Sequence, residues 1–389
     1  MMHGKGYSTA IQQLLRPQLM NLPTYDPGAD PEQVARQYSV PRVVKLSNNE
    51  NPYGISPLAA QALERRLAQG LGRYPDPVGN SLCEALARRH ELPRSRFILG
   101  NGSENILELL CQAFLSPGDR VVTQAPCFGL HEIFPLMMGA QVSKVALTPV
   151  FGFDAEAWQN ALATPAKLLF ISNPCNPVGT AFSRNELQTI VRAAPQDCLL
   201  VIDEAYYEYA IGDPLYPDAL QMLRTQNRPW IVLRTFSKAY GLASLRVGYG
   251  IASHDDLIDA LHRIRPPYNV NQLAQEAAMA ALEDTQHLER SVSLIGEERA
   301  RLTLVLRKAG FRVAPSLANF LFIDTATDAS ALVRALLREG IIVKAWREPG
   351  YETFIRTSLS LPADNDLFLQ ALSRVHATAC DLPPHVLPT

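Results

Sequence analysis

The sequence predicts an α/β fold in which a mainly parallel sheet is followed by a smaller α+β unit. Continuous apolar runs in the middle of the chain alternate with segments of helical periodicity, which is typical of strands buried on both faces of a parallel sheet. Polar motifs follow three of these runs directly. From about residue 292 the pattern changes to helix, strand, helix, strand and strand, which favours a second, smaller unit.

The elements of the expected parallel sheet follow from periodicity. A helix is predicted to open at Ser103 and to end before Ser116-Pro117-Gly118, because apolar residues recur at positions 106, 109, 110, 113 and 114. The expected strands are residues 120–123, 167–171, 199–202 and 231–233. In open parallel sheets ligands bind beyond the carboxyl ends of the strands, and the polar motifs lie there.

The smaller unit is expected to hold helices 297–308 and 329–338 and strands 318–323, 341–344 and 353–358. The proline-rich N-terminal segment, with prolines at 17, 23, 27 and 31, is expected to pack against it, and residues 382–389 to form an unstructured end. We therefore predict a large domain over 46–275, and a small domain with an N-terminal arm over 1–45 and 276–389.

Composition excludes several classes of protein. The 389 residues carry 36 basic and 38 acidic side chains, so neither nucleic acid nor an anionic membrane is an expected partner. No apolar run reaches the roughly 18 residues of a spanning helix, and we expect no signal peptide. The six cysteines show no CxxC spacing, which favours reduced thiols of a cytoplasmic protein over disulfides or a metal site.

The segment 234–250, RTFSKAYGLASLRVGYG, places Lys238 among hydroxyl groups at the end of a buried strand. A partly desolvated lysine has a lowered pKa and can attack a carbonyl to form a Schiff base. Pyridoxal 5′-phosphate (PLP) supplies such a carbonyl. Its phosphate needs hydroxyls, an arginine and a helix N-terminus, its ring nitrogen needs a carboxylate, and its ring oxygen needs a hydrogen-bond donor.

Each of these needs has a candidate. The phosphate could bind Thr235, Ser237 and Arg246 together with the backbone N–H groups of Ser103 and Glu104. Asp203 is the candidate for the ring nitrogen, Tyr206 and Asn176 for the ring oxygen, and Phe128 for the ring face. Taken singly, these are an ordinary surface lysine, a helix cap, turn residues and a core aromatic. Their arrival together on consecutive strand ends favours the cofactor.

Three segments carry a family resemblance: SNPCNPVGT (172–180), VIDEAYYEY (201–209) and RTFSKAYGLASLRVGY (234–249). They resemble the signature segments of fold-type I, PLP-dependent aminotransferases, the aspartate aminotransferase superfamily. Within it the chain is most similar to histidinol-phosphate aminotransferases, through LPTYDPG, KLSNNENPYG, RYPDP, GNGSENI, PPYNVNQLAQ and PSLANFLF. The similarity runs from about residue 16 to about residue 374.

The resemblance implies an aspartate-aminotransferase-like fold and a role for each motif residue. Lys238 is the Schiff-base lysine and moves the proton during the reaction. The residues assigned above to the cofactor's phosphate, ring nitrogen, ring oxygen and ring face keep those roles. Tyr74, in RYPDP, reaches the cofactor phosphate of the neighbouring subunit, which implies a homodimer with shared active sites. Tyr25 and Asn51 lie near the substrate, and Arg356, in FIRTS, binds its anionic group.

Two departures from the family pattern concern the substrate. Lys344 stands where many members have an arginine, so the two-pronged fit to an anion is lost, and Arg347 or Tyr351 is a candidate for assisting it. The segment after Arg356 reads TSLSLP where the family more often has a glycine.

The implied reaction is transamination between L-histidinol phosphate and 2-oxoglutarate, which gives imidazole acetol phosphate and L-glutamate in histidine biosynthesis. An aromatic amino acid aminotransferase and a threonine-phosphate decarboxylase are the alternatives. A PLP-binding regulator or degenerate paralogue is disfavoured, because every catalytic position is filled and no basic helix-turn-helix pattern precedes NENPYG.

Overall fold

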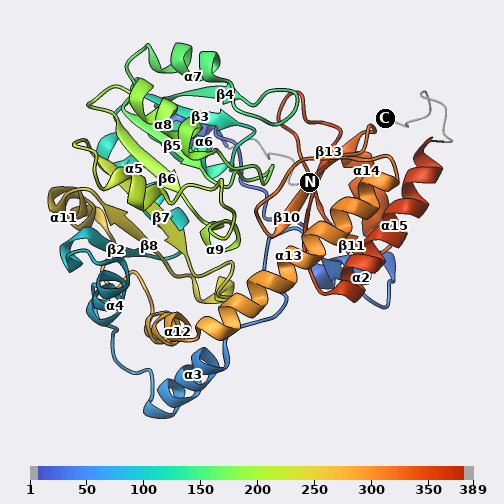
Figure 1. The fold of residues 1–389 in the computed structure, drawn as a ribbon, viewed down its shortest axis with the longest axis horizontal. Coiled ribbons are helices and arrows are strands. Elements are labelled where there is room, and N and C mark those ends of the chain that lie inside the picture. Colours follow the sequence, from blue (N-terminus) through green and yellow to red (C-terminus); the bar gives the residue numbers. More distant parts are fainter. Residues whose placement is uncertain (1–7, 381–389) are drawn as a thin grey trace.

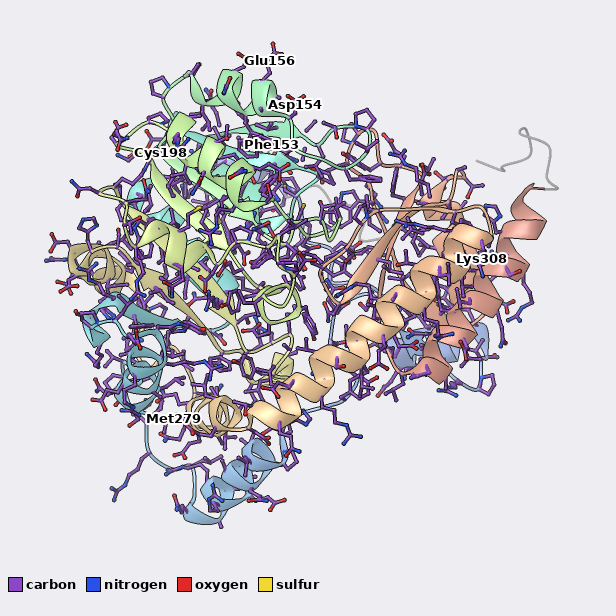
Figure 2. The ribbon with its side chains drawn as sticks, in the orientation of Figure 1. Phe153, Asp154, Glu156, Cys198, Met279 and Lys308 are labelled. Atoms are coloured by element: carbon purple, nitrogen blue, oxygen red, sulfur yellow. The ribbon has the colours of Figure 1, made fainter. Side chains whose placement is uncertain are left out.

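The protein is described by a computed structural model that covers residues 8–380, with side chains up to residue 376. Two sheets of different size lie side by side, the larger on the left and the smaller on the right of Figure 1. The long helix α13 (Thr285–Lys308) runs obliquely from one to the other, with Lys308 at the end beside the smaller sheet (Figure 2).

The larger sheet has seven strands in the order β2-β8-β7-β6-β5-β3-β4. Its strands are β2 (Phe97–Gly100), β3 (Arg120–Ala125), β4 (Gln141–Ala146), β5 (Leu168–Ser172), β6 (Leu199–Asp203), β7 (Trp230–Thr235) and β8 (Gly248–Ala252). Only β8 runs antiparallel to its neighbours. The four predicted strands are β3, β5, β6 and β7, all parallel, so the predicted mainly parallel sheet is confirmed.

Helices cover both faces of this sheet (Figure 1). One face packs against α5 (Ser103–Phe114) and α11 (Asp255–Ile264). The other packs against α4 (Asn80–His90), α7 (Ala155–Leu162), α8 (Arg184–Ala193), α10 (Ala219–Leu223) and α12 (Gln272–Glu283). Burial on both faces explains why these strands are continuous apolar runs. In Figure 2, Asp154 and Glu156 lie at the start of α7, where the Asp154 carboxylate accepts the N–H of Ala157 and caps the helix.

The smaller sheet has four antiparallel strands in the order β12-β13-β10-β9. They are β9 (Arg312–Val313), β10 (Phe320–Asp324), β12 (Lys344–Ala345) and β13 (Phe354–Ser358). Helices α13, α14 (Ala329–Arg338) and α15 (Pro362–Cys380) contribute to the same core.

Two predictions for this unit need correction. The charged helix starts at Thr285 rather than at residue 297, because Asp284 caps it by accepting the N–H of His287. The single strand expected over 341–344 is divided between two sheets. β11 (Ile341–Ile342) pairs in parallel with β1 (Val44–Lys45), and Lys344 begins β12.

The proline-rich N-terminal segment packs against both units, not against the smaller one alone. Helix α2 (Pro31–Tyr38) lies on α14, as expected. The turn η1 (Pro17–Leu19) instead packs against α6 (Leu130–Met137), where Arg16 donates to the carbonyl of Met137. The last carbonyl groups of a helix lack partners within it, so an arginine is stabilised there. The predicted unstructured end lies outside the described residues.

The remaining elements are α1 (Thr9–Gln12), α3 (Pro57–Gln69), η2 (Arg94–Arg96), α9 (Tyr207–Ala210) and η3 (Ala243–Leu245). Every cysteine whose side chain is described is buried and free, including Cys198 directly before β6 (Figure 2). This agrees with the expected reduced thiols. Among residues 8–380, no helix combines the length and the apolar character needed to cross a membrane.

Candidate active site

A cavity of about 330 Å³ lies between the two sheets, beyond the carboxyl ends of β5, β6 and β7. That size lies within the range of small-molecule sites. The sequence-predicted residues that line it are Tyr25, Ser103, Glu104, Phe128, Asn176, Asp203, Tyr206, Thr235, Ser237, Lys238, Arg246, Lys344 and Arg356. The structure therefore brings together segments that are more than 300 positions apart in the sequence.

Lys238 lies in the turn that follows β7. Its Nζ donates to the carbonyl of Asn48 at 2.9 Å. Burial, reinforced by the charge of Arg356, lowers the pKa of the ammonium to about 8. A lysine with this pKa has a substantial neutral, nucleophilic fraction near neutral pH.

Asp203 ends β6, and its carboxylate is almost fully buried. Its Oδ2 lies 3.2 Å from Nε2 of His131, and its Oδ1 accepts the N–H of Ala205. Because a carboxylate only accepts hydrogen bonds, Nε2 is the protonated ring nitrogen. His131 lies on α6, is completely buried and was not predicted. It follows the predicted Phe128 by three residues, but its contact with Asp203 could not be predicted from that position.

Arg246 and the start of α5 face each other across one end of the cavity. The guanidinium donates to Ser237 Oγ at 3.4 Å and to Glu104 Oε1 at 2.6 Å. Gly102, with φ of +78°, lies so close to Arg246 that any Cβ would overlap the guanidinium. The N–H groups of the first turn of α5 point outward from the helix end. Hydroxyl, guanidinium and backbone N–H groups thus converge as an anion site.

Tyr206 and Asn176 lie at the middle of the cavity. Tyr206 accepts from Asn49 Nδ2 at 3.0 Å, and burial raises the pKa of its hydroxyl to about 12, so it keeps its proton. The oxygen of Asn176 accepts from Arg356 at 2.6 Å, which leaves its NH₂ group as a donor.

The loop 47–50 was not predicted as part of the site. Asn49 has φ of +57°, and its groups bond Tyr206, Asn319 and the hydroxyl of Ser358. Ser358 belongs to the TSLSLP segment in which the chain departs from the family pattern. Its hydroxyl therefore holds this loop against the site.

Lys344 and Arg356 occupy the wall that the smaller sheet provides. They are partners in the β12–β13 register, so both side chains lie on the same face of the sheet. Lys344 Nζ donates to the carbonyl of Asp26 at 2.7 Å, while Arg356 donates to Asn176 and to the carbonyl of Ser47. Burial, followed by the charge of Arg356, lowers the pKa of Lys344 to about 8.

Within the described part of the chain, neither cation has a carboxylate partner, and the buried Nε of Arg356 has no hydrogen-bond acceptor. Buried cations without counter-charges are costly. This wall is therefore suited to an anionic ligand. Arg347 is exposed and Tyr351 packs on Phe322 and Phe354, so neither lines the cavity as the sequence had suggested.

Two predicted residues lie outside the cavity. Asn51 bonds the backbone around Lys238, donating to the carbonyl of Ala239 at 2.8 Å. Tyr74 is 79% exposed and stacks on Tyr268 with ring centroids 4.3 Å apart. A residue that completes a neighbouring subunit's site must be exposed in its own chain, so the prediction for Tyr74 stays open.

Comparison with known protein families identifies the family of this chain. The pattern of the aminotransferase class I and II family matches residues 41–372. The chain belongs to this family. Membership confirms the predicted superfamily and the predicted aminotransferase activity.

Curated relatives of this aminotransferase are similar over nearly their whole length. Histidinol-phosphate aminotransferase 3 of Rhizobium meliloti (strain 1021) is 45% identical over 93% of this chain and 98% of its own. Histidinol-phosphate aminotransferase 2 of Pseudomonas aeruginosa is 42% identical, over 94% of this chain and 98% of its own.

Solved structures confirm the aspartate-aminotransferase-like fold. The histidinol-phosphate aminotransferase from Sinorhizobium meliloti, in complex with pyridoxal-5′-phosphate, superposes with a TM-score of 0.84 at 28% identity, over 96% of this chain and 99% of that one. Thermus thermophilus aspartate aminotransferase with maleate gives a TM-score of 0.79 at 23% identity, over 93% of this chain and 99% of that one. At that identity the second likeness concerns the fold alone.

Proposed function

We propose that this aminotransferase transfers the amino group of L-histidinol phosphate to 2-oxoglutarate, with PLP as cofactor, as a step of histidine biosynthesis. The observation that carries the proposal is a pair of cations, the half-buried Lys344 and the buried Arg356, that faces the cavity without carboxylate partners among the described side chains. Each substrate of this reaction brings an anionic group: the phosphate of the amino donor, or a carboxylate of glutamate and 2-oxoglutarate. Curated relatives named for this activity are 42–45% identical to the chain.

The residues of the cavity fit PLP at each of its polar groups. The anion site of Ser103, Glu104, Ser237 and Arg246 suits the phosphate, with the Glu104 contribution coming from its backbone N–H. Asp203, oriented by His131, would hold the proton on the ring nitrogen. Tyr206 and the NH₂ group of Asn176 would donate to the ring oxygen, and Phe128 would cover one ring face. Bound PLP supplies an electron sink for the carbon that loses its proton.

The chain's own residues then divide the work. Lys238 would hold the cofactor covalently and, once released, carry the proton from the substrate's Cα, because its lowered pKa suits a base near neutral pH. Arg356 and Lys344 would hold the substrate's anionic group, and Tyr25 would cover the cavity, where its ring lies edge-on to Phe128 at 6.1 Å. Asn51 would act on the substrate side only through the backbone of Ala239 that it holds.

We infer a two-domain division with a large PLP-binding domain over 46–275 and a small domain with an N-terminal arm over 1–45 and 276–389. The apolar core around the smaller sheet supports the small domain. Helix α12 spans the proposed boundary, and its residues after 275 pack on the larger sheet. We also infer a cytoplasmic homodimer, with Tyr74 of one subunit at the cofactor phosphate of the other. The exposed Tyr74–Tyr268 stack supports the dimer, and the buried free thiols support the location.

A substrate comparison tests the proposed function. The holoenzyme is mixed separately with histidinol phosphate, phenylalanine and threonine phosphate, while the visible absorption of the bound cofactor and carbon dioxide release are followed. The proposal expects the highest kcat/KM with histidinol phosphate and no carbon dioxide. Preference for phenylalanine would identify an aromatic aminotransferase, and carbon dioxide from threonine phosphate a decarboxylase.

The covalent role of Lys238 has its own test. After borohydride reduction, mass spectrometry of the digested protein should locate the cofactor on the peptide that contains Lys238. Lys238→Ala should lose that label and the activity. Full activity in Lys238→Ala would refute the assigned site.

A further inference from the structure

A cluster of charged groups outside the cavity ties the two sheets together. Glu348 lies in the connection 346–353 between β12 and β13. Its Oε1 accepts from Lys144 Nζ at 2.8 Å, and its Oε2 accepts from the backbone N–H of Cys127 at 3.1 Å. Lys144 belongs to β4 and Cys127 to the loop between β3 and α6, so both partners are part of the larger unit.

The cluster is partly buried and its polar atoms are well matched. Trp346 Nε1 donates to Glu348 Oε2 at 2.8 Å, and Lys144 also contacts Glu132 Oε2 at 2.7 Å. Burial opposes the charge of Lys144, but the acidic groups around it, Cys127, Glu132 and Glu348, raise its pKa above the ordinary value. Its ammonium therefore supplies the positive charge between the two carboxylates. In a partly buried setting such bonds fix geometry better than an exposed ion pair does.

The position of Glu348 relates it to both ends of the proposed reaction. Strand β12, before the connection, begins with Lys344, and strand β13, after it, contains Arg356. These are the two cations proposed to hold the substrate's anion. The residue after Cys127 is Phe128, which lines the cavity at the proposed cofactor ring. Within the described residues, the hydrogen bonds between this connection and the larger unit all involve Glu348.

We propose that Glu348 is a positioning residue that sets the distance between the anion-binding strands β12 and β13 and the cofactor-binding loop of Phe128. This rests on the proposed function, in which the anion at Lys344 and Arg356 and the cofactor at Phe128 belong to one reaction. Without Glu348 the strands would lose their polar link to the loop, and the anion would bind less tightly at the distance that the cofactor requires.

The test compares Glu348→Ala and Glu348→Gln with a matched control, Glu352→Ala. Glu352 lies in the same connection and is exposed. Among the residues that the structure describes, its carboxylate accepts only the N–H of Gly350, within its own loop. Glutamine keeps an acceptor for Cys127 but loses the charge that attracts Lys144. For each holoenzyme we would measure kcat and KM for both substrates, cofactor content, and the affinity for inorganic phosphate by calorimetry.

For Glu348→Ala we expect KM for both substrates and the Kd of phosphate to rise about tenfold, a ratio that corresponds to about 1.4 kcal/mol. We expect kcat to change less than about threefold and cofactor content to stay unchanged. Glu348→Gln should recover part of the loss, and Glu352→Ala should match the wild type. A lower melting temperature in Glu348→Ala with unchanged KM and phosphate affinity would show a merely structural residue and overturn the inference.

The inorganic phosphate measurement separates this inference from the proposed substrate. If the wild type does not turn over histidinol phosphate but Glu348→Ala still weakens phosphate binding, the substrate proposal fails and the role of Glu348 stands. If the wild type turns over histidinol phosphate and Glu348→Ala behaves like Glu352→Ala, the role of Glu348 fails alone. A wild-type holoenzyme that binds no phosphate would refute the anion site and the inference with it.

Discussion

Lys238 and Arg356 face one cavity, and the charge of Arg356 affects the pKa of Lys238. Burial contributes most to the lowered pKa of Lys238, and the positive charge of Arg356 lowers it further. A guanidinium keeps its proton at any working pH, so the lysine is the group that gives its proton up. The same arginine that is proposed to hold the substrate therefore also helps to make Lys238 nucleophilic.

The pH dependence of cofactor uptake tests this state of Lys238. Because the folded pKa is lowered to about 8, the neutral amine fraction grows about tenfold per pH unit below that value and levels off above it. Stopped-flow absorbance of the cofactor-free protein mixed with PLP should show this profile.

Arg356→Gln should move the plateau of that profile to higher pH, by less than the full difference from an ordinary lysine, because burial remains. In the wild type, a rate of cofactor uptake that keeps rising to about pH 10, the ordinary lysine value, would contradict the lowered pKa of Lys238.

Arg356→Gln should also weaken both half-reactions, because one guanidinium is proposed to hold the anion of either substrate. We expect kcat/KM to fall on the order of 100-fold for histidinol phosphate and for 2-oxoglutarate, as for loss of a buried, hydrogen-bonded charge partner. Arg347→Gln is the control, since Arg347 is an exposed neighbour that does not line the cavity. Single-turnover kinetics on each half-reaction would measure this, and an effect on one half-reaction only would exclude the shared role.

At the scale of elements, the turn after β7 depends on glycine. Gly241 has φ of +72°, and any Cβ on it would overlap the backbone carbonyl of Gly54. A Cβ added to Gly248, at the start of β8, would likewise overlap the backbone N–H of Ser103 at the start of α5. The chain thus approaches itself closely at both glycines. Gly241 also turns the chain through a positive φ, whereas Gly248 lies in strand β8 without one and allows only the close approach.

Gly241→Ala should therefore destabilise the fold by about 2–4 kcal/mol, since both backbone strain and a backbone overlap oppose it. The matched control is Gly212→Ala, because Gly212 has an ordinary φ and open space around its Cα. Urea unfolding of both variants would give the difference in free energy of unfolding. Equal stabilities would mean that the turn relaxes without cost.

Whether an element could be predicted depended on whether the burial of its side chains leaves a pattern in the sequence. The strands 120–123, 167–171, 199–202 and 231–233 were predictable because burial on both faces leaves a continuous apolar run. The division of 341–344 between two sheets was not predictable, because the apolar character of Val343 does not depend on which sheet its neighbours join.

The candidate site shows the same contrast. Lys238, Asp203 and Arg246 stand in motifs at strand ends, so the sequence could place them together. His131, Asn49 and Glu348 act through contacts with residues at least 70 positions away in the sequence. No local sequence pattern predicts such contacts, which become visible only in the folded chain.

At the scale of the whole molecule, the loop 47–50 holds the two units at the cavity. It receives hydrogen bonds from Lys238 of the larger unit and from Arg356 and Asn319 of the smaller one. Lys238 and Arg356, the proposed cofactor lysine and substrate arginine, therefore hydrogen-bond the same short loop. The cavity depends on both sheets, and on a second chain if Tyr74 acts as proposed.

Shared active sites predict that two impaired variants restore activity when they are mixed, if PLP is kept too dilute to load Tyr74→Ala. Lys238→Ala removes the covalent link within its own subunit, while Tyr74→Ala removes a proposed contact with the partner's cofactor phosphate. In a mixed dimer, one site receives both substitutions and the other receives none. Refolding the two variants together at equal amounts should give about a quarter of wild-type activity, because half of the dimers are mixed and each has one intact site.

Each variant refolded alone is the control, and Tyr74→Ala alone should lose cofactor affinity by about tenfold or more, as for one hydrogen bond to a charged group. A mixture no more active than the sum of its parts would show that Tyr74 acts within its own chain or not at all.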